Sequence, residues 1–444
     1  AVATGHFKIS GKVDKTEDVY INLDSAIDSI RNLERTKTTK RGNTYYLSIR
    51  GSLLNETVWA KSGHTLVEEQ FPLDFFFDKD TMTVKKSWVF NAVGVSSLST
   101  KDEGGKITVF RHLGSQAAPH VVIDKETGSI ITINSPEGNN LLGPNHRMVP
   151  HFTRASTDND RGGMELMLSF LYPDSGLEEL WAKFYGTASF SYHTRWRLVG
   201  LDQARPPQLA CNGTWVSETP DNQRVDIEAI VSVTKNGNKK KELIKQKIIY
   251  HVYMDGRIKV SNQVMPRPAL EGCASLPRVG MSLGLNKSLY NIQYFGRGPF
   301  ENYEDRKTAA HMGVFQTTPK DMAYDYIYPS ENGNRSDCEW VAMRSSTGEG
   351  VCFASDGRDE HGHRNKFHFS ALLHSSGEYH AASHTCDLEN RENGKHPIYL
   401  NLDHKLMGLG GDMRCVYLLN CSCDVRCIML VVSTNILLPN HLNL

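Results

Sequence analysis

Apolar and polar side chains alternate with a period of two along much of this chain, which is the pattern of half-buried β-strands. The alternation is clearest in residues 226–234, 243–254 and 258–264. The turn-forming pairs Asn236-Gly237 and Asp255-Gly256 separate these segments. Together they predict a meander of consecutive antiparallel strands.

Followed along its length, the pattern predicts an all-β chain. Residues 1–95 contain short strand patterns at roughly ten-residue spacing, which indicates a small β-sandwich. A stretch rich in Ser, Thr, Asp, Glu and Gly, 96–106, is typical of an inter-domain linker. Residues 107–412 predict one large antiparallel domain of two sheets packed face to face, with a single helix at 177–185. A tail rich in Cys and Leu, 413–444, follows.

The composition of the chain argues against nucleic acid and membranes as partners. Among 444 residues, 50 Lys and Arg balance 50 Asp and Glu, so no net charge favours nucleic acid or an anionic membrane as a partner. The longest nearly apolar run, 427–438, has about 12 residues and is shorter than the roughly 20 that span a bilayer. We therefore expect a soluble protein with neither partner. The first residue is Ala, which we interpret as a processed or truncated end.

The nine cysteines favour reduced thiols over a disulfide framework. Five are scattered singly between 211 and 386, as buried core thiols are. The other four lie between 415 and 427 without the paired C-x2-C units of a structural zinc site. The sequence leaves the compartment open and favours the cytoplasm.

A polar and aromatic segment, 294–307, interrupts the apolar pattern. It offers Phe300 and Tyr303 as anchors, and Glu301, Asp305 and Arg306 are expected to pair locally. The segment is too polar for a core and too aromatic for a solvated loop. It predicts a structural corner of fixed shape between strands.

Two further polar segments admit a structural and a functional interpretation. Asp158, Asn159 and Asp160 carry oxygen atoms that could hold a hard cation, but they are too few for a calcium loop, and we favour a structural turn. The Gly-centred loop 329–335 has donors and acceptors suited to sugar hydroxyls or to its own backbone.

Histidines and strand-end polar residues give the remaining candidates. His361 and His363 would share one face of a strand, but no third ligand is placed by spacing, so we predict no metal site in this chain. Tyr399, Asn401 and Asp403 would also share a strand face. An aromatic plate beside two planar polar groups is what a sugar subsite requires. No serine-hydrolase elbow, phosphate-binding loop or zinc-protease motif occurs.

These segments resemble the C-terminal part of the large β-galactosidases of glycoside hydrolase family two. The matching runs are Trp59-Ala60-x-x-Gly63-His64 with Glu69-Gln70, then Phe152-Thr153-Arg154-Ala155 through Asp158-Asn159-Asp160, then Gly296-x-Gly298-Pro299-x-Glu301-Asn302-Tyr303-x-Asp305-Arg306, then Pro329-Ser330-Glu331-Asn332-Gly333, and finally Leu400-Asn401-x-Asp403 through Met407-Gly408-x-Gly410-Gly411-Asp412. They occur in the family's order and span most of the chain, which makes the ordered set specific where each run alone would be weak.

The resemblance implies an N-terminally incomplete immunoglobulin-like domain followed by a β supersandwich of the galactose-mutarotase type. In the family, a (β/α)8 barrel carries the acid/base and nucleophile glutamates of retaining hydrolysis and binds magnesium and sodium. That barrel has no counterpart in this sequence. The resemblance therefore implies no catalytic residue and no cofactor in this chain, but a barrel domain or large subunit as partner, in a homo- or hetero-oligomer, and a β-galactoside as substrate.

The resemblance also suggests site residues. Tyr399 matches a position where some members stack a Trp on the sugar in the leaving-group subsite, and Glu165 matches a loop that moves over the site. We expect Asn401 and Asp403 to contribute to sugar binding beside Tyr399. The structural family motif comprises Arg154, Asp158, Asn159, Asp160, Glu301, Asn302, Tyr303, Asp305, Arg306, Glu331 and Asn332.

The sequence departs from the family after Asp412, where Met413-Arg414-Cys415 begins the tail. We expect this departure to remove the last strands of the sandwich and to leave one sheet edge unpaired. Three hypotheses follow: the C-terminal portion or small subunit of a β-galactosidase, inactive alone; a non-catalytic carbohydrate-binding or scaffolding module; and a disrupted product without a stable fold.

Overall fold

Long antiparallel strands form where the sequence alternates. Strand β10 (Glu242–Tyr253) alternates buried and half-buried positions through most of its length. It pairs with β9 (Arg224–Thr234) on one side and β11 (Arg257–Pro266) on the other. The predicted meander and both of its turns are thus confirmed, and so is the predicted all-β class of the chain.

The computed structural model describes residues 4–6, 20–36, 45–73, 95–162, 191–237, 241–271, 273, 275–355, 365–410 and 423–433. It divides into two compact units, Ala1–Val89 and Phe90–Leu444. None of the described helices is long and apolar enough to cross a membrane. The helix expected at 177–185 lies outside the described residues.

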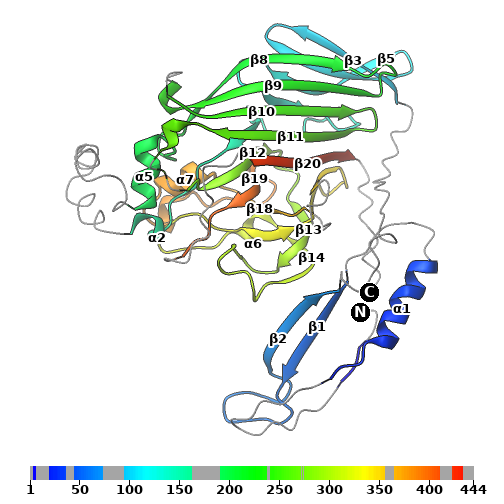
Figure 1. The fold of residues 1–444 in the computed structure, drawn as a ribbon, viewed down its shortest axis with the longest axis vertical. Helices are drawn as coiled ribbons and strands as arrows, with labels where there is room; N and C mark the ends of the chain where they lie inside the picture. Colours follow the sequence, from blue (N-terminus) through cyan, green and yellow to red (C-terminus); the bar gives the residue numbers. More distant parts are fainter. Residues whose placement is uncertain are drawn as a thin grey trace. The chain divides into compact units, whose positions relative to one another are not determined.

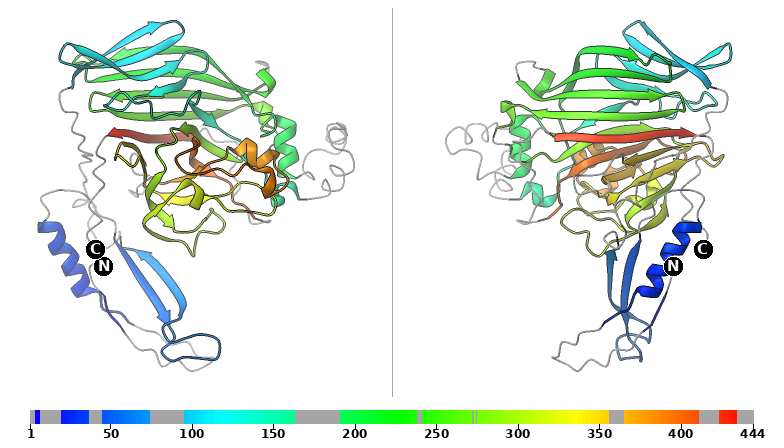
Figure 2. Two further views of the ribbon diagram at one scale, coloured as in Figure 1. Left: turned by 180° about the vertical axis from the view of Figure 1, so that it is seen from behind. Right: turned by 45° about the vertical axis from the view of Figure 1, so that its right-hand side comes forward.

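The larger unit contains two nine-stranded sheets (Figures 1 and 2). The first has the order β14 (His311–Thr317), β13 (Asn291–Gly298), β16 (Trp340–Arg344), β17 (Gly350–Ser355), β20 (Cys423–Ser433), β11, β10, β9 and β8 (Gln208–Glu218). The second has the order β15 (Arg335–Cys338), β18 (Phe367–Leu372), β19 (Ile398–Leu406), β12 (Arg278–Leu285), β7 (Met148–His151), β6 (Ser129–Ile133), β5 (Gln116–Asp124), β4 (Lys106–Leu113) and β3 (Val95–Glu103).

The sheets share one apolar core. Val231 and Tyr250 contribute to it from the first sheet, and Ile123 and Leu402 from the second. Short helices connect the strands in this unit: α2 (Asp158–Arg161), α5 (Tyr192–Val199), α6 (Pro319–Met322), α7 (Ser376–Ala381), η2 (Lys235–Gly237), η4 (Pro268–Leu270) and η5 (Thr385–Asp387). Two sheets facing each other across a core match the predicted face-to-face arrangement.

The linker expected at 96–106 is wrong, because most of it belongs to β3, an edge strand paired with β4. Gly104 and Gly105 form the two-residue turn between these strands, each with positive φ, a conformation that glycine adopts without steric cost. An edge strand faces solvent along one side, so it tolerates the Ser- and Thr-rich sequence that suggested a linker.

The unpaired edge expected beyond Asp412 is also wrong. Strand β20 lies inside the first sheet, between β11 and β17, and pairs antiparallel with both. Its backbone closes the sheet at the point where an open edge was expected. The expected boundary at residue 412 therefore cuts through the sandwich.

The smaller unit contains a helix that the strand pattern did not predict. Helix α1 (Asp24–Thr36) has Ile27 and Ile30 three residues apart, with acidic Asp24 in its first turn. Strands β1 (Tyr46–Ser52) and β2 (Thr65–Pro72) form an antiparallel hairpin. The immunoglobulin-like identity of residues 1–95 stays a prediction.

Candidate functional site

One face of β19 carries the predicted sugar-binding side chains. Leu400 and Leu402 belong to the core, so Tyr399, Asn401 and Asp403 point to the opposite, outer face of the sheet. Tyr399 is half-buried, whereas Asn401 is 6% exposed and Asp403 is fully buried. Only the tyrosine of this trio is therefore accessible to a ligand in the described structure.

A buried cluster of charges surrounds Asp403. Nη2 of Arg278 lies 3.3 Å from Oδ2 of Asp403 and donates a 3.0 Å hydrogen bond to Oε1 of Glu331. Nη1 of Arg278 lies 3.2 Å from Nδ1 of His151. Arg278 thereby joins β12, β19, β7 and the loop 329–335.

The cluster holds two carboxylates for one guanidinium, and burial shifts the pKa of one of them, Asp403. Burial raises the pKa of Asp403 to about 7, with Arg278 lowering it and Glu331 raising it. Burial and Arg278 together hold the pKa of His151 well below its ordinary value. The His151 imidazole is therefore neutral, so its Nδ1 can accept a hydrogen bond from Nη1 of Arg278.

Tyr399 stands at the open end of this face. Its ring meets His146 edge-on, with centroids 5.4 Å apart and an angle of 87°. Gly284 lies opposite Tyr399 on β12, and a Cβ there would be 2.2 Å from Cγ of His146. Glycine at this position therefore leaves room for the imidazole that supports the tyrosine ring. Burial raises the pKa of Tyr399, with the Glu378 carboxylate adding to this effect and the Arg391 guanidinium opposing it.

The first family run folds around a second buried ion pair. Arg154 binds Asp160 through two parallel hydrogen bonds of 3.0 and 2.7 Å, and both side chains are fully buried. Arg154 also donates to the carbonyls of Met407 and Gly408, at 2.6 and 3.0 Å. Residues about 250 positions apart in sequence are thus bound together, as a planar guanidinium can do.

The structural turn favoured for Asp158–Asp160 is what the structure contains. Thr157 caps α2, and the Asp160 carboxylate accepts from the Thr157 backbone. Nδ2 of Asn159 donates to the carbonyl of Leu409 at 3.0 Å. Asp158 is exposed in the first turn of α2. Asn159 contacts the loop 407–410 directly, and Asp160 supports it through Arg154.

The corner at 294–307 supports the same loop from the other side. The carboxylate of Asp305, expected to pair within the corner, instead accepts hydrogen bonds from the backbone of Leu409 at 3.2 Å and Gly410 at 2.7 Å. A Cβ on Gly408 would lie 2.4 Å from Cγ of Asp305, so this close approach needs glycine. The corner predicted from sequence is therefore a support for the loop that follows β19.

The remaining corner residues tie it to the loop 329–335. Glu301 pairs with Arg306 and accepts hydrogen bonds from the Tyr326 hydroxyl and the Gly333 backbone, each at 2.5 Å. Asn302 is fully buried and accepts from the Ser336 backbone at 2.9 Å.

Two further motif residues complete this framework. Asn332 is buried, donates to the Ser330 carbonyl at 2.9 Å and accepts from the Tyr324 backbone at 3.2 Å. Tyr303 is fully buried, and the Arg306 guanidinium lies 5.4 Å from its ring centroid. Asn302, Tyr303 and Asn332 are thus buried supports within this framework, whereas Asp158 is exposed.

Some predicted residues lie outside the described part of the chain: Glu165, His361, His363, Gly411 and Asp412. Within the described part, no group of three His, Cys, Asp or Glu side chains is arranged to hold a metal ion. Among the described residues there is therefore no set of ligands that could be compared with the magnesium and sodium sites implied by the family resemblance.

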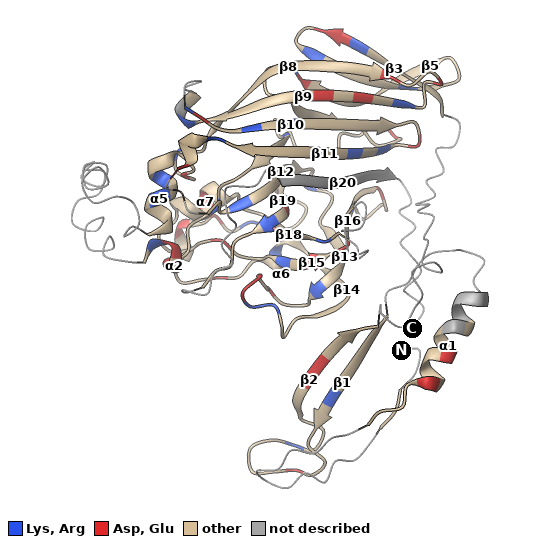
Figure 3. Cartoon of the chain, in the orientation of Figure 1, with Lys and Arg blue, Asp and Glu red and all other residues tan. Residues whose placement is uncertain are grey.

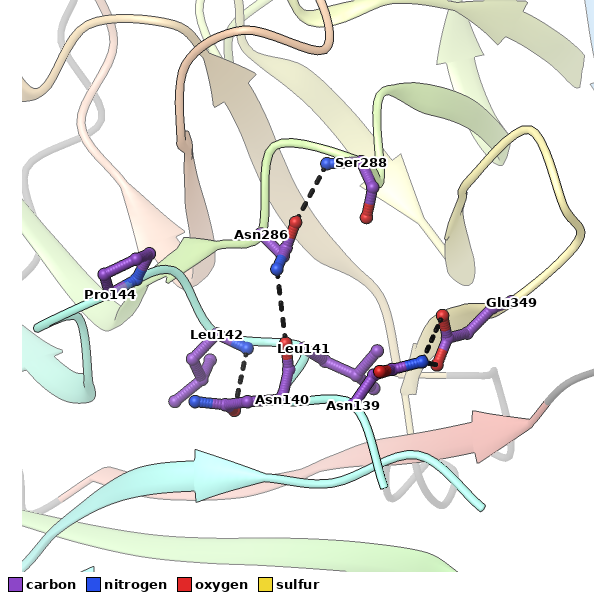
Figure 4. A pocket seen from close by; sticks show the side chains of 8 residues that line it. All are labelled: Asn139, Asn140, Leu141, Leu142, Pro144, Asn286, Ser288 and Glu349. Carbon is purple, nitrogen blue, oxygen red and sulfur yellow. Dashed lines mark hydrogen bonds between the residues drawn. The ribbon is translucent and has the colours of Figure 1, made fainter. Parts of the chain in front are cut away.

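A cleft of about 470 Å³ lies between the 139–144 loop, the turn after β12 and the β16–β17 hairpin, and no β19 residue is among those that line it (Figure 4). Its polar groups largely satisfy one another: Asn139 donates to Glu349 at 3.2 Å, and Asn286 donates to the Asn140 carbonyl at 3.4 Å. It contains none of the predicted site residues.

Sequence reasoning missed Arg278, His146 and Gly284. Arg278 follows Pro277 in a segment with no recognisable motif. His146 and Gly284 acquire their roles only when β12 pairs with β19. No local signal in the sequence could have found them.

The fold by itself defines an all-β protein with two antiparallel sheets packed face to face, and comparison with known proteins narrows it to a family. Residues 115–422 match the family described as beta galactosidase small chain. Because this match covers more than half of the sequence, the chain belongs to that family.

Three relatives are named beta-galactosidase. The chain is 25% identical to one from Pseudoalteromonas haloplanktis over 85% of its own length and 31% of the relative. It is 29% identical to one from Vibrio cholerae over 59% of this chain and 21% of the relative. It is 26% identical to one from Priestia megaterium over 83% of this chain and 29% of the relative. The chain thus spans at most about a third of the length of these relatives.

A solved structure of a copper-containing benzylamine oxidase from Hansenula polymorpha aligns over 86% of this chain and 68% of that one, at 10% identity. Its TM-score of 0.28 is too low to support any conclusion about fold or function.

Proposed function

We propose that this chain is the C-terminal portion or small subunit of a β-galactosidase that hydrolyses terminal β-D-galactosides with retention. The supporting observation is the match of residues 115–422 to the small chain, combined with coverage of only 31% of a full-length relative. The acid/base and nucleophile carboxylates would come from a barrel domain or large subunit, together with magnesium and sodium. This chain would complete the active site.

In this proposal, Tyr399 stacks on the sugar in the leaving-group subsite. The ring is half-buried and held edge-on by His146, so binding would cost it little conformational entropy. Asn401 and Asp403 would contribute to the same sugar site from buried positions on the same strand face. Asn401 donates a hydrogen bond to Ser370 at 3.1 Å, and Asp403 lies beside Arg278. Glu165 is proposed to reach the site from its loop.

A complementation assay tests the proposal. The purified chain is assayed on a chromogenic β-galactoside alone, and again after mixing with a barrel-bearing large subunit of a β-galactosidase. We expect no hydrolysis by the chain alone and restored hydrolysis in the mixture. Hydrolysis by the isolated chain would show that a catalytic pair lies within it.

A second candidate is a non-catalytic carbohydrate-binding or scaffolding module of an oligomer. It is favoured by the half-buried Tyr399 ring, held edge-on by His146, because this ring offers a sugar a stacking surface that needs no catalytic group. Sugar binding without restored hydrolysis in the mixture would support this second function.

A further inference from the structure

A β-bulge turns Trp215 out of the core. Along β8, Cys211 pairs with Val231 and Gly213 with Ile230, so Asn212 is an extra residue. Cys211 packs against the core, and uninterrupted alternation would point Trp215 toward it as well. The extra residue reverses the alternation. Bulges commonly re-aim side chains in this way at functional positions.

Gly213 provides a flat seat for the outward-facing indole. A Cβ at this position would lie 2.7 Å from Cη2 of Trp215 and 3.1 Å from Cζ2. The indole therefore rests over the glycine backbone while the residue remains 56% exposed. A single exposed aromatic is ordinary, but the bulge and the glycine seat together present a fixed aromatic plate.

Two carboxylates stand on the same sheet face as this plate, on the neighbouring strand β9. Glu228 lies directly across from Trp215 on β9, and Asp226 follows two residues earlier. Glu228 forms an ion pair with Lys247 at 2.8 Å, and Asp226 contacts Arg224 at 2.9 Å and His251 at 2.7 Å. Figure 3 shows acidic residues on β9 and basic residues on β10 and β11. Carboxylates beside the ring favour a neutral ligand over nucleic acid or a sulfated glycan.

We propose that Trp215 is the stacking platform of a second carbohydrate-binding site, for a neutral oligosaccharide, on the outer face of the β8–β11 sheet. The weakly positive C–H groups of a sugar ring pack on the electron-rich indole face. The Glu228 carboxylate and the Ser217 hydroxyl stand on the same face and accept from sugar hydroxyls. The site is separate from Tyr399, which projects from the outer face of the other sheet.

Calorimetric titration of the full chain with linear β-1,4-galactotetraose tests the site. We expect Trp215→Ala to weaken binding at least tenfold, because the stacking surface is lost. Gly213→Ala should weaken it too, because the new methyl group displaces the indole from its seat. Tyr253→Ala is the matched control: the guanidinium of Arg257 already lies 4.8 Å from the Tyr253 ring centroid, so its removal should leave the affinity within twofold.

Unchanged binding by Trp215→Ala would overturn the proposal, and so would a failure of the wild-type chain to bind galacto-, gluco- or mannotetraose. Heparin binding that depends on Trp215 and exceeds that of the neutral sugars would overturn the assigned ligand class. The test is independent of the proposed hydrolysis. Trp215→Ala should leave turnover of a small chromogenic galactoside unchanged in the complemented enzyme.

Discussion

The two outer faces of the sandwich differ in how deeply their ion pairs are buried. On the β12–β19 face, the side chains of Arg278 and Asp403 are both 0% exposed and lie 3.3 Å apart. On the β9–β10 face, Lys247 and Glu228 approach to 2.8 Å but remain 39% and 32% exposed. One sheet face buries its ions beneath loops, and the other leaves them in water.

The difference shows what each face contributes. Burying an ion pair costs desolvation that the mutual attraction recovers only with good geometry, so such pairs add little net stability. Arg278 and Arg154 instead fix which loops lie against β19, through contacts to Glu331 and to the Met407 carbonyl. The exposed ion pairs of the solvated face contribute little to stability.

The largest expected effect comes from removing the shared cation. Arg278→Met should destabilise the chain by about 3–5 kcal/mol, because it leaves the Asp403 and Glu331 carboxylates buried without a partner. Lys247→Met, the matched change on the solvated face, should cost about 0–1 kcal/mol. Urea unfolding followed by tryptophan fluorescence measures both. Equal losses would contradict the contrast between the faces.

A smaller, pH-dependent effect is expected at Asp403. Its folded pKa of about 7 exceeds the ordinary value of 3.8, so the folded state holds this proton more tightly than the unfolded chain. The resulting stability is complete below about pH 4 and is lost as the pH rises through about 7.

Asp403→Asn removes this titration while nearly preserving shape. Relative to the variant, the wild-type chain should lose about 1.4 kcal/mol of unfolding free energy per pH unit between about pH 5 and 6.5. Unfolding curves recorded across that range measure the difference. A difference that stays constant with pH, or grows in favour of the wild type, would argue against a raised pKa.

Much of the framework could be predicted from local patterns. The pairs Asn236-Gly237 and Asp255-Gly256 marked the turns of the β9–β11 meander, and the polar density of 294–307 marked a structural corner. These features depend on neighbouring residues, so a short window of sequence contains them. For Tyr399, the alternation of the sequence predicts which face of the strand the side chain occupies, but not that the ring is half-buried.

The rest depends on contacts between distant segments. Arg278 organises two carboxylates only because β12 pairs with β19 and the loop 329–335 covers them. Strand β3 was mistaken for a linker because an edge strand tolerates polar residues. The bulge at Asn212 reverses the side-chain alternation of β8, which a regular period cannot reveal.

Galactosyl transfer to glucose by the complemented enzyme tests the central claim most directly, since this acceptor would occupy the subsite that we assign to Tyr399. Tyr399→Ala should weaken the glucose response by about 1–3 kcal/mol, through loss of the stacking surface, and Tyr253→Ala on the opposite face should not. A glucose response that Tyr399→Ala leaves unchanged would contradict the assignment of this face to the sugar site.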